Sequence, residues 1–171
     1  MATTMIVLRL IHIFSGVFWA GSVFFVAAFL LPGLRASGPA GGQVMQQIIT
    51  KLRFPRAAGA VGVLTILSGA GMYWHNNSIS GGAWARSVPG MTYALGAVAA
   101  IAAIVVFATI IGPTGEKLLS LTGAIQSGGG PPSAEQATTL TFLQGKMAVA
   151  SRLGAGCLAV AVLCMATARY L

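Results

Sequence analysis

The chain has 171 residues, of which 56% are hydrophobic and only 7% are charged, and its formal net charge is +8. A water-soluble domain carries about 25% charged residues, so the composition argues against a soluble protein and indicates an integral membrane protein. The ten basic residues are spread along the chain instead of forming the clustered face that binds nucleic acid. We therefore expect the lipid bilayer, and no nucleic acid, as a partner.

Four long apolar stretches take up most of the chain, at about residues 5–31, 54–75, 91–112 and 147–170. Each reaches the ~20 residues that a helix needs to cross a hydrocarbon layer about 30 Å thick. Because unpaired backbone groups are costly in lipid, these stretches predict transmembrane helices. The first stretch is longer than the apolar region of a signal peptide, so we expect it to be retained. The sequence thus predicts one all-α transmembrane domain over residues 1–171, an antiparallel four-helix bundle.

The distribution of basic residues predicts the orientation of this bundle. One side holds only Arg9, Arg86 and Arg169, whereas the connections and helix ends on the other side hold seven: Arg35, Lys51, Arg53, Arg56, Lys117, Lys146 and Arg152. Loops rich in Lys and Arg stay in the cytoplasm, which places both termini on the outer side of the membrane. The aromatic residues agree, since five of them fall at the proposed outer boundary: Tyr73, Trp74, Trp84, Tyr93 and Tyr170.

The first cytoplasmic connection opens with a stretch over residues 32–42 that we expect to be flexible, and then becomes periodic. Over residues 43–53, five apolar residues share one helical face: Val44, Met45, Ile48, Ile49 and Leu52. This spacing predicts an amphipathic helix. Its basic end suits a position in the inner headgroup layer, and a short cap packed on the bundle fits the pattern equally well.

The second cytoplasmic connection, residues 114–146, predicts a helical hairpin. Pro113 ends or kinks the third span, and the run Gly128–Pro132 breaks the chain. Ser133 followed by Gln136 fits a capping box that opens the last helix, which we expect to run unbroken into the fourth span. The hairpin either docks a partner or has a purely structural role.

An ionisable side chain at membrane depth is expensive to keep, which makes His12 the leading candidate for a functional residue. Gly16 and Trp19 follow it at steps of four and three on the same helix face, and Arg9 lies one turn outward. These four residues are the cofactor-binding candidates. The alternative is that His12 makes only a polar hydrogen bond between helices.

Depth below the outer boundary ranks the partners that His12 would need at a metal site. At 1.5 Å per residue, His12 lies roughly 10 Å deep, Cys164 and Met165 about 7–9 Å and Met72 about 5 Å, while His75 lies at the surface. This disfavours a haem held by His12 and His75, and favours a His/Met haem or a Cu(I) site with sulfur ligands. The candidate metal ligands are His12, Met72, His75, Cys164 and Met165. Each of these residues also has a purely structural alternative, in which it fills space in the apolar core or lies at the membrane interface.

The sequence lacks the groups that ordinary catalysis requires. No Asp or Glu lies within any span, and there is no nucleophile with a base beside it, no phosphate-binding loop and no pair of cysteines separated by two residues. General acid–base chemistry would fall to His12 alone. These absences argue against an enzyme, and against hydrolysis in particular.

Several short runs resemble a known group of membrane proteins. They are Leu10-Ile11-His12-Ile13 to Trp19-Ala20-Gly21, Leu31-Pro32-Gly33-Leu34, Gly38–Gly42, Ser68-Gly69 to Tyr73-Trp74, and Ile111-Gly112-Pro113-Thr114. Together they resemble small four-span bacterial membrane proteins of the copper-resistance-D-like type, in an uncharacterised branch. The resemblance implies a bacterial inner-membrane protein with copper or haem as ligand, and His12 is the position that matches. The related four-helix protoporphyrinogen oxidases also have a histidine in the first helix, but this chain has Leu30-Leu31-Pro32 where they have a further one.

The leading hypothesis is therefore a polytopic inner-membrane protein that binds a haem or a copper ion through His12 in the outer leaflet, for redox chemistry or metal handling. The first alternative is an accessory subunit without a cofactor, which docks a partner through its cytoplasmic hairpin. A weaker alternative is a membrane oxidase of porphyrin metabolism. Glycine-rich helix faces permit a homodimer or a place in a membrane complex.

Overall fold

The computed structural model describes residues 2–171, which form helices and turns and contain no strand. The all-α class expected from the sequence is confirmed. In chain order, the helical segments are α1 (Ala2–Phe25), η1 (Val26–Leu30), α2 (Leu31–Ala36), α3 (Gly38–Thr50), α4 (Phe54–Ile79), η2 (Trp84–Arg86), α5 (Val88–Val106), η3 (Phe107–Ile111), α6 (Gly112–Ser127), α7 (Ala134–Thr167) and η4 (Ala168–Tyr170).

Four continuous helical stretches are long and apolar enough to cross a membrane: Thr3–Ala36, Phe54–Ile79, Val88–Ser127 and Ala134–Tyr170. Each of the four spans predicted from the sequence lies inside one of them. The first, third and fourth stretches are much longer than the ~20 residues that a bilayer requires. The additional turns lie where we expected connections between spans.

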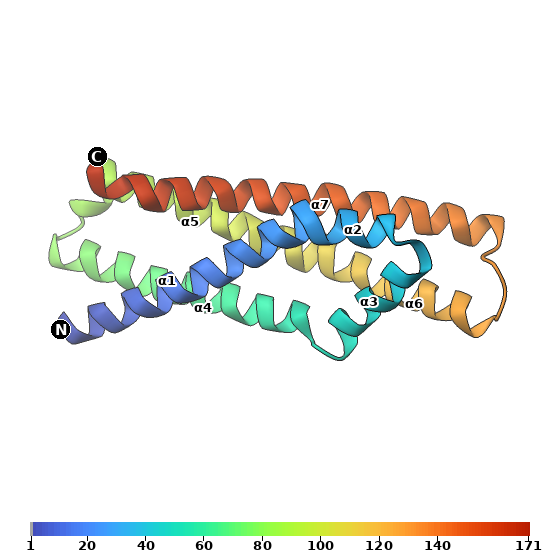
Figure 1. Cartoon of the computed structure of the whole chain (residues 1–171). Coiled ribbons are helices and arrows are strands. Elements are labelled where there is room, and N and C mark those ends of the chain that lie inside the picture. The colour runs from blue at the N-terminus through green and yellow to red at the C-terminus, as the bar shows by residue number, and fades with distance from the viewer. Residues whose placement is uncertain (1) are drawn as a thin grey trace.

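The long helices pack in two close pairs, α1 with α4 and α5 with α7 (Figure 1). Both chain ends lie at one end of the molecule, near η2, while α2, α3 and the turn between α6 and α7 lie at the other. Helix α1 begins beside α4 and crosses toward α7, which η1 contacts. Buried residues of α1, α5 and α7 meet in the centre: Trp19, Ala100, Ala103, Leu158 and Ala161.

Helices α1 and α5 each continue into a π-helical turn, η1 and η3, one residue before a proline. The N–H of Leu31 bonds to the carbonyl of Val26, and that of Gly112 to the carbonyl of Phe107, so both hydrogen bonds span five residues instead of four. The next residue is Pro32 in one helix and Pro113 in the other. A proline ring clashes with the carbonyl four residues before it. The wider turn gives the ring room, and the chain stays helical through both prolines.

Residues 32–42, which we expected to be flexible, are helical in the structure, and this expectation is wrong. Pro32 directly follows the widened turn of η1, which accommodates its ring, so the helix continues into α2. The helix breaks only near Gly38, where φ is +56°. Helix α3 then begins five residues before the predicted start at residue 43 and packs on α2. The approach is close, because a Cβ at Gly41 would overlap the carbonyl of Leu34.

The start of the last long helix agrees with the sequence analysis. The Ser133 hydroxyl accepts from the N–H of Gln136 at 3.2 Å, and the Gln136 side chain accepts from the N–H of Ser133 at 2.9 Å. The predicted capping box is therefore confirmed. Helix α7 runs unbroken for 34 residues, and after the glycine-proline turn its first half packs back along α6.

Candidate functional site

His12 lies on α1 at the contact with α4, and its ring is held by the α4 backbone. Nδ1 of His12 is 2.8 Å from the carbonyl oxygen of Thr65. A carbonyl oxygen can only accept a hydrogen bond, so Nδ1 carries the proton and donates it. In the neutral ring the lone pair then lies on the other nitrogen, Nε2. This single contact determines which atom of His12 is able to bind a ligand.

A glycine on α4 gives the imidazole its place. A Cβ at Gly69 would lie 2.8 Å from Cε1 and 3.0 Å from Nδ1 of His12. These distances are shorter than ordinary van der Waals contacts, so any side chain larger than that of glycine would displace the ring. The ring therefore rests directly on the α4 backbone. The Ser68 hydroxyl, 3.5 Å from Nδ1, borders the same nitrogen. Its own proton is directed to the carbonyls of Leu64 and Thr65 at 2.7 and 3.0 Å.

One turn further along the contact between α1 and α4, the buried hydroxyls of Ser15 and Thr65 meet. Thr65 Oγ1 lies 2.8 Å from Ser15 Oγ across the helix pair, and Ser15 donates to the carbonyl of Ile11 at 2.6 Å. Hydroxyls buried in apolar surroundings are costly unless they are bonded, and these are. His12, Ser15, Thr65 and Ser68 thus form one polar cluster that joins α1 to α4.

Nε2 of His12 is the nitrogen that this cluster leaves available. Among residues 2–171, the hydrogen bonds of the ring are made by Nδ1, and every fully buried side-chain nitrogen or oxygen has a partner. Nε2 is therefore not sealed in the protein interior. A histidine that donates through Nδ1 to a backbone carbonyl and keeps Nε2 free has the arrangement typical of metal-bound histidines.

The other cofactor-binding candidates on α1 lie in three different surroundings. Gly16 faces α4, where its Cβ would stand 3.5 Å from Cγ2 of Thr65. Trp19 is buried in the core, and its indole occupies the space beside Gly62, whose Cβ would lie 2.9 Å from Cε2 of the ring. Arg9 is exposed. Of these three, only Gly16 shares the contact that holds His12.

The sulfur ligands suggested by depth lie at another helix contact. Cys164 and Met165 pack against α5, where a Cβ at Gly96 would be 2.9 Å from Cβ of Cys164 and 3.1 Å from Cε of Met165. His12 instead contacts α4. Met72 is half-buried on α4. Within residues 2–171, no three His, Cys, Asp or Glu side chains come close enough to form a metal cluster.

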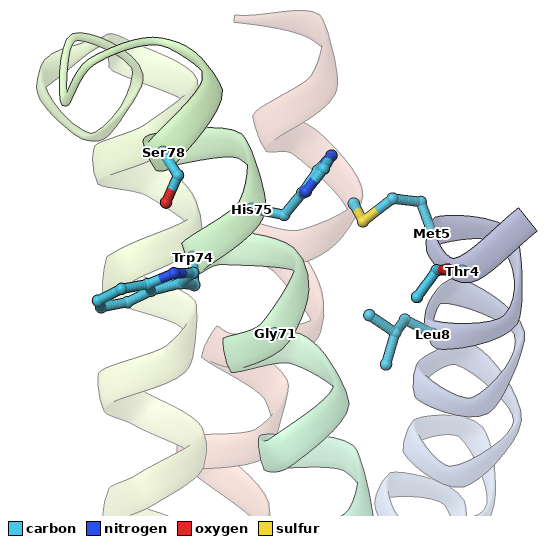
Figure 2. Close-up of a pocket in the computed structure, with 7 residues that line it drawn as sticks. All are labelled: Thr4, Met5, Leu8, Gly71, Trp74, His75 and Ser78. Carbon is cyan, nitrogen blue, oxygen red and sulfur yellow. The ribbon is translucent and has the colours of Figure 1, made fainter. Parts of the chain in front are cut away.

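His75 lines an open groove of about 380 Å³ between the ends of α1 and α4 (Figure 2). The groove is bordered by Thr4, Met5, Leu8, Gly71, Trp74, His75 and Ser78. Figure 2 shows the imidazole of His75 and the thioether of Met5 extending toward each other from the two helices. Leu8, one turn outward of His12, packs 3.5 Å from the Cβ position of Gly71. Both histidines of the chain therefore lie along the same α1–α4 contact, with Leu8 between them.

Sequence reasoning missed three of the residues that surround the two histidines. Neither Thr65 nor Ser68 was predicted as a neighbour of His12, and Met5 was not predicted as a neighbour of His75. A signal was present, because Thr65 and Ser68 are polar residues three apart in an apolar stretch and so share a helix face.

Comparison with known proteins adds no assignment, since no family model, no curated protein and no solved structure matches the chain. The function must be argued from the geometry of the site.

Proposed function

We propose that the chain is a polytopic protein of the bacterial inner membrane that binds a haem iron or a copper ion through Nε2 of His12. The observation that carries the proposal is the 2.8 Å contact between Nδ1 and the carbonyl of Thr65. It fixes the tautomer, orients the ring and leaves one lone pair for a ligand. Four helices long and apolar enough to span a bilayer support the membrane location.

Haem suits this site better than copper. A haem iron takes four nitrogens from the porphyrin and requires only one from the protein, as in globins and peroxidases. A copper ion would require further side chains, and the nearby groups of the polar cluster are hydroxyls whose protons are already used.

The distribution of charge supports an orientation with both termini outside. The seven basic residues of the predicted cytoplasmic side are all exposed. Four of them lie on α2, in the turn between α3 and α4, or in the first turn of α4, away from the end that holds both termini (Figure 1). Only three basic residues lie at the end with the termini. In this orientation His12 is in the outer half of the membrane.

An absorption spectrum with metal analysis tests the proposal. Protein purified in detergent and mixed with haemin should show a Soret band, which His12→Ala should abolish. His75→Ala is the matched control, because it removes the other histidine of the chain, and should keep the band. His12→Asn should fold best, since the Asn amide can still donate to the Thr65 carbonyl, and should nonetheless lose the band. A band that persists in His12→Asn, or no band and no bound copper in the wild type, contradicts the proposal.

A second candidate, an accessory subunit without a cofactor, is favoured by the same contact in a different way. The bond from Nδ1 to Thr65 already gives His12 a role in holding α1 to α4. If that role is the whole function, the protein binds neither haem nor copper, and His12→Asn behaves as the wild type in every assay. The spectrum therefore separates the two candidates.

A further inference from the structure

The turn between α3 and α4 carries an unusual set of exposed side chains. Helix α3 ends at Thr50 and α4 begins at Phe54, and the three residues between them are Lys51, Leu52 and Arg53. All three are exposed, and so is Arg56 in the first turn of α4. Leu52 has 71% of its surface exposed. The turn thus presents three cations with an uncovered leucine among them.

The backbone holds this arrangement in place. Leu52 donates its N–H to the carbonyl of Gln47 at 3.1 Å, and the N–H groups of Arg56 and Ala57 bond to the carbonyl of Arg53. Arg53 has φ +49° and is the only residue other than glycine with a positive φ within residues 2–171. The turn is therefore a fixed corner that joins two helices, and its cations belong to one small surface.

The charge of this corner is not balanced by the protein. The chain has only two acidic side chains, Glu116 and Glu135, and both belong to α6 and α7. Neither acidic residue belongs to α3 or α4, so Lys51, Arg53 and Arg56 give the corner a formal charge of +3. The corner is complementary to a negatively charged surface.

The exposed leucine decides which kind of negatively charged surface fits. A nucleic acid or an acidic peptide would leave Leu52 in water. The boundary between phosphates and acyl chains accommodates both the cations and the leucine, because each basic residue gains about 1 kcal/mol beside an anionic leaflet and an apolar side chain reaches the hydrocarbon. The corner lies at the end of α4, a candidate membrane span, so it meets this boundary if α4 crosses the bilayer.

We propose that the α3–α4 corner, formed by Lys51, Leu52, Arg53 and Arg56, binds the headgroup phosphate of anionic phospholipids. The proposal rests on the membrane location in the proposed function but not on His12, so the loss of the haem assignment would leave it intact. Lys51, Arg53 and Arg56 contact the phosphate, and Leu52 contacts the acyl chains.

The test measures lipid binding to the delipidated full-length protein by native mass spectrometry, with phosphatidylglycerol or phosphatidylcholine added stepwise. The wild type should prefer phosphatidylglycerol. At about fivefold per cation, the variant Lys51→Gln/Arg53→Gln/Arg56→Gln should lose roughly a hundredfold of that preference. The control Lys117→Gln/Lys146→Gln/Arg152→Gln removes the same charge from α6 and α7 and should lose less than tenfold. Leu52→Gln should weaken the binding of both lipids.

Three outcomes would overturn the proposal. The first is equal binding of both lipids by the wild type. The second is an equal loss in the control variant, which would mean that the preference is a diffuse effect of the net charge. The third is a thermal stabilisation by inorganic phosphate alone that matches the effect of phosphatidylglycerol, because the corner would then be a site for free anions. Arg53→Gly keeps the positive φ without strain, so it should stay folded. It removes one cation and should still lose about fivefold of the preference, which would show that a loss of binding does not come from unfolding.

Discussion

Replacing Gly69 by alanine is the sharpest test of how His12 is held. The added Cβ would stand 2.8 Å from Cε1 and 3.0 Å from Nδ1 of the ring, so the imidazole has to move away from α4 and its bond to Thr65 has to lengthen. An added methyl in a packed site costs about 1–3 kcal/mol, and a lost hydrogen bond between membrane helices costs about 0.6 kcal/mol more. Alanine returns up to about 1 kcal/mol through its helix propensity. The net effect should be a destabilisation of roughly 0.5–2.5 kcal/mol.

Gly71→Ala is the matched control, two residues further along the same helix. Its Cβ would meet only Leu8, at an ordinary 3.5 Å, so the gain in helix propensity should appear without a clash. Unfolding of both variants in detergent, by heat or by titration with SDS, should separate them by about 1.5–3.5 kcal/mol, with Gly71→Ala the more stable. If haem binds, Gly69→Ala should also shift or weaken the Soret band while Gly71→Ala leaves it unchanged. Equal stabilities would refute the idea that the ring rests on the backbone at Gly69.

Further substitutions test other contacts by the same unfolding assay. Gly62→Ala places a Cβ 2.9 Å from the Trp19 ring and should destabilise by about 1–3 kcal/mol; wild-type stability would mean that the indole can move. Thr65→Val removes the hydroxyl that faces Ser15 and should cost about 0.6 kcal/mol, with no change in the His12 contact to the backbone. Ser133→Ala removes the cap of α7 and should cost about 1 kcal/mol, a loss that would be absent if the helix end frays. Arg53→Gly removes the strain of a positive φ in a residue with a Cβ and should stabilise the protein by about 1 kcal/mol. A net loss of stability would show that the arginine side chain makes a contact worth more than this strain.

The positions of the four long helices were predictable from the sequence because they depend on local signals. Apolar runs gave the four long helices, the glycine-proline run gave the break before α7, and Ser133 with Gln136 gave its first residue. Where the signal was weaker the prediction failed. Residues 32–42, which contain two prolines, were predicted to be flexible, although a helix accommodates a proline in its first turn or after a widened turn.

The partners of His12 were not predictable from the same reasoning. Depth along the membrane normal gives one coordinate of a side chain, and residues at equal depth on different helices can still face different neighbours. Cys164 and Met165 were ranked by depth alone, and the structure shows them packed against Gly96 instead. The neighbour of His12 is Thr65, 53 residues away. Thr65 and Ser68 mark a polar face of α4 in the sequence, but the sequence does not show which helix that face meets.

The widened turns before Pro32 and Pro113 change how positions in this chain are counted. A hydrogen bond that spans five residues holds one residue more than a regular turn, which is equivalent to a single insertion. Beyond Leu30 and beyond Ile111, every side chain is displaced by about one position around the helix axis from the phase set by the preceding turns. A chimera, a deletion or an alignment that treats residues 3–36 or 88–127 as uniform helices would therefore rotate α2 and α6 onto the wrong neighbours.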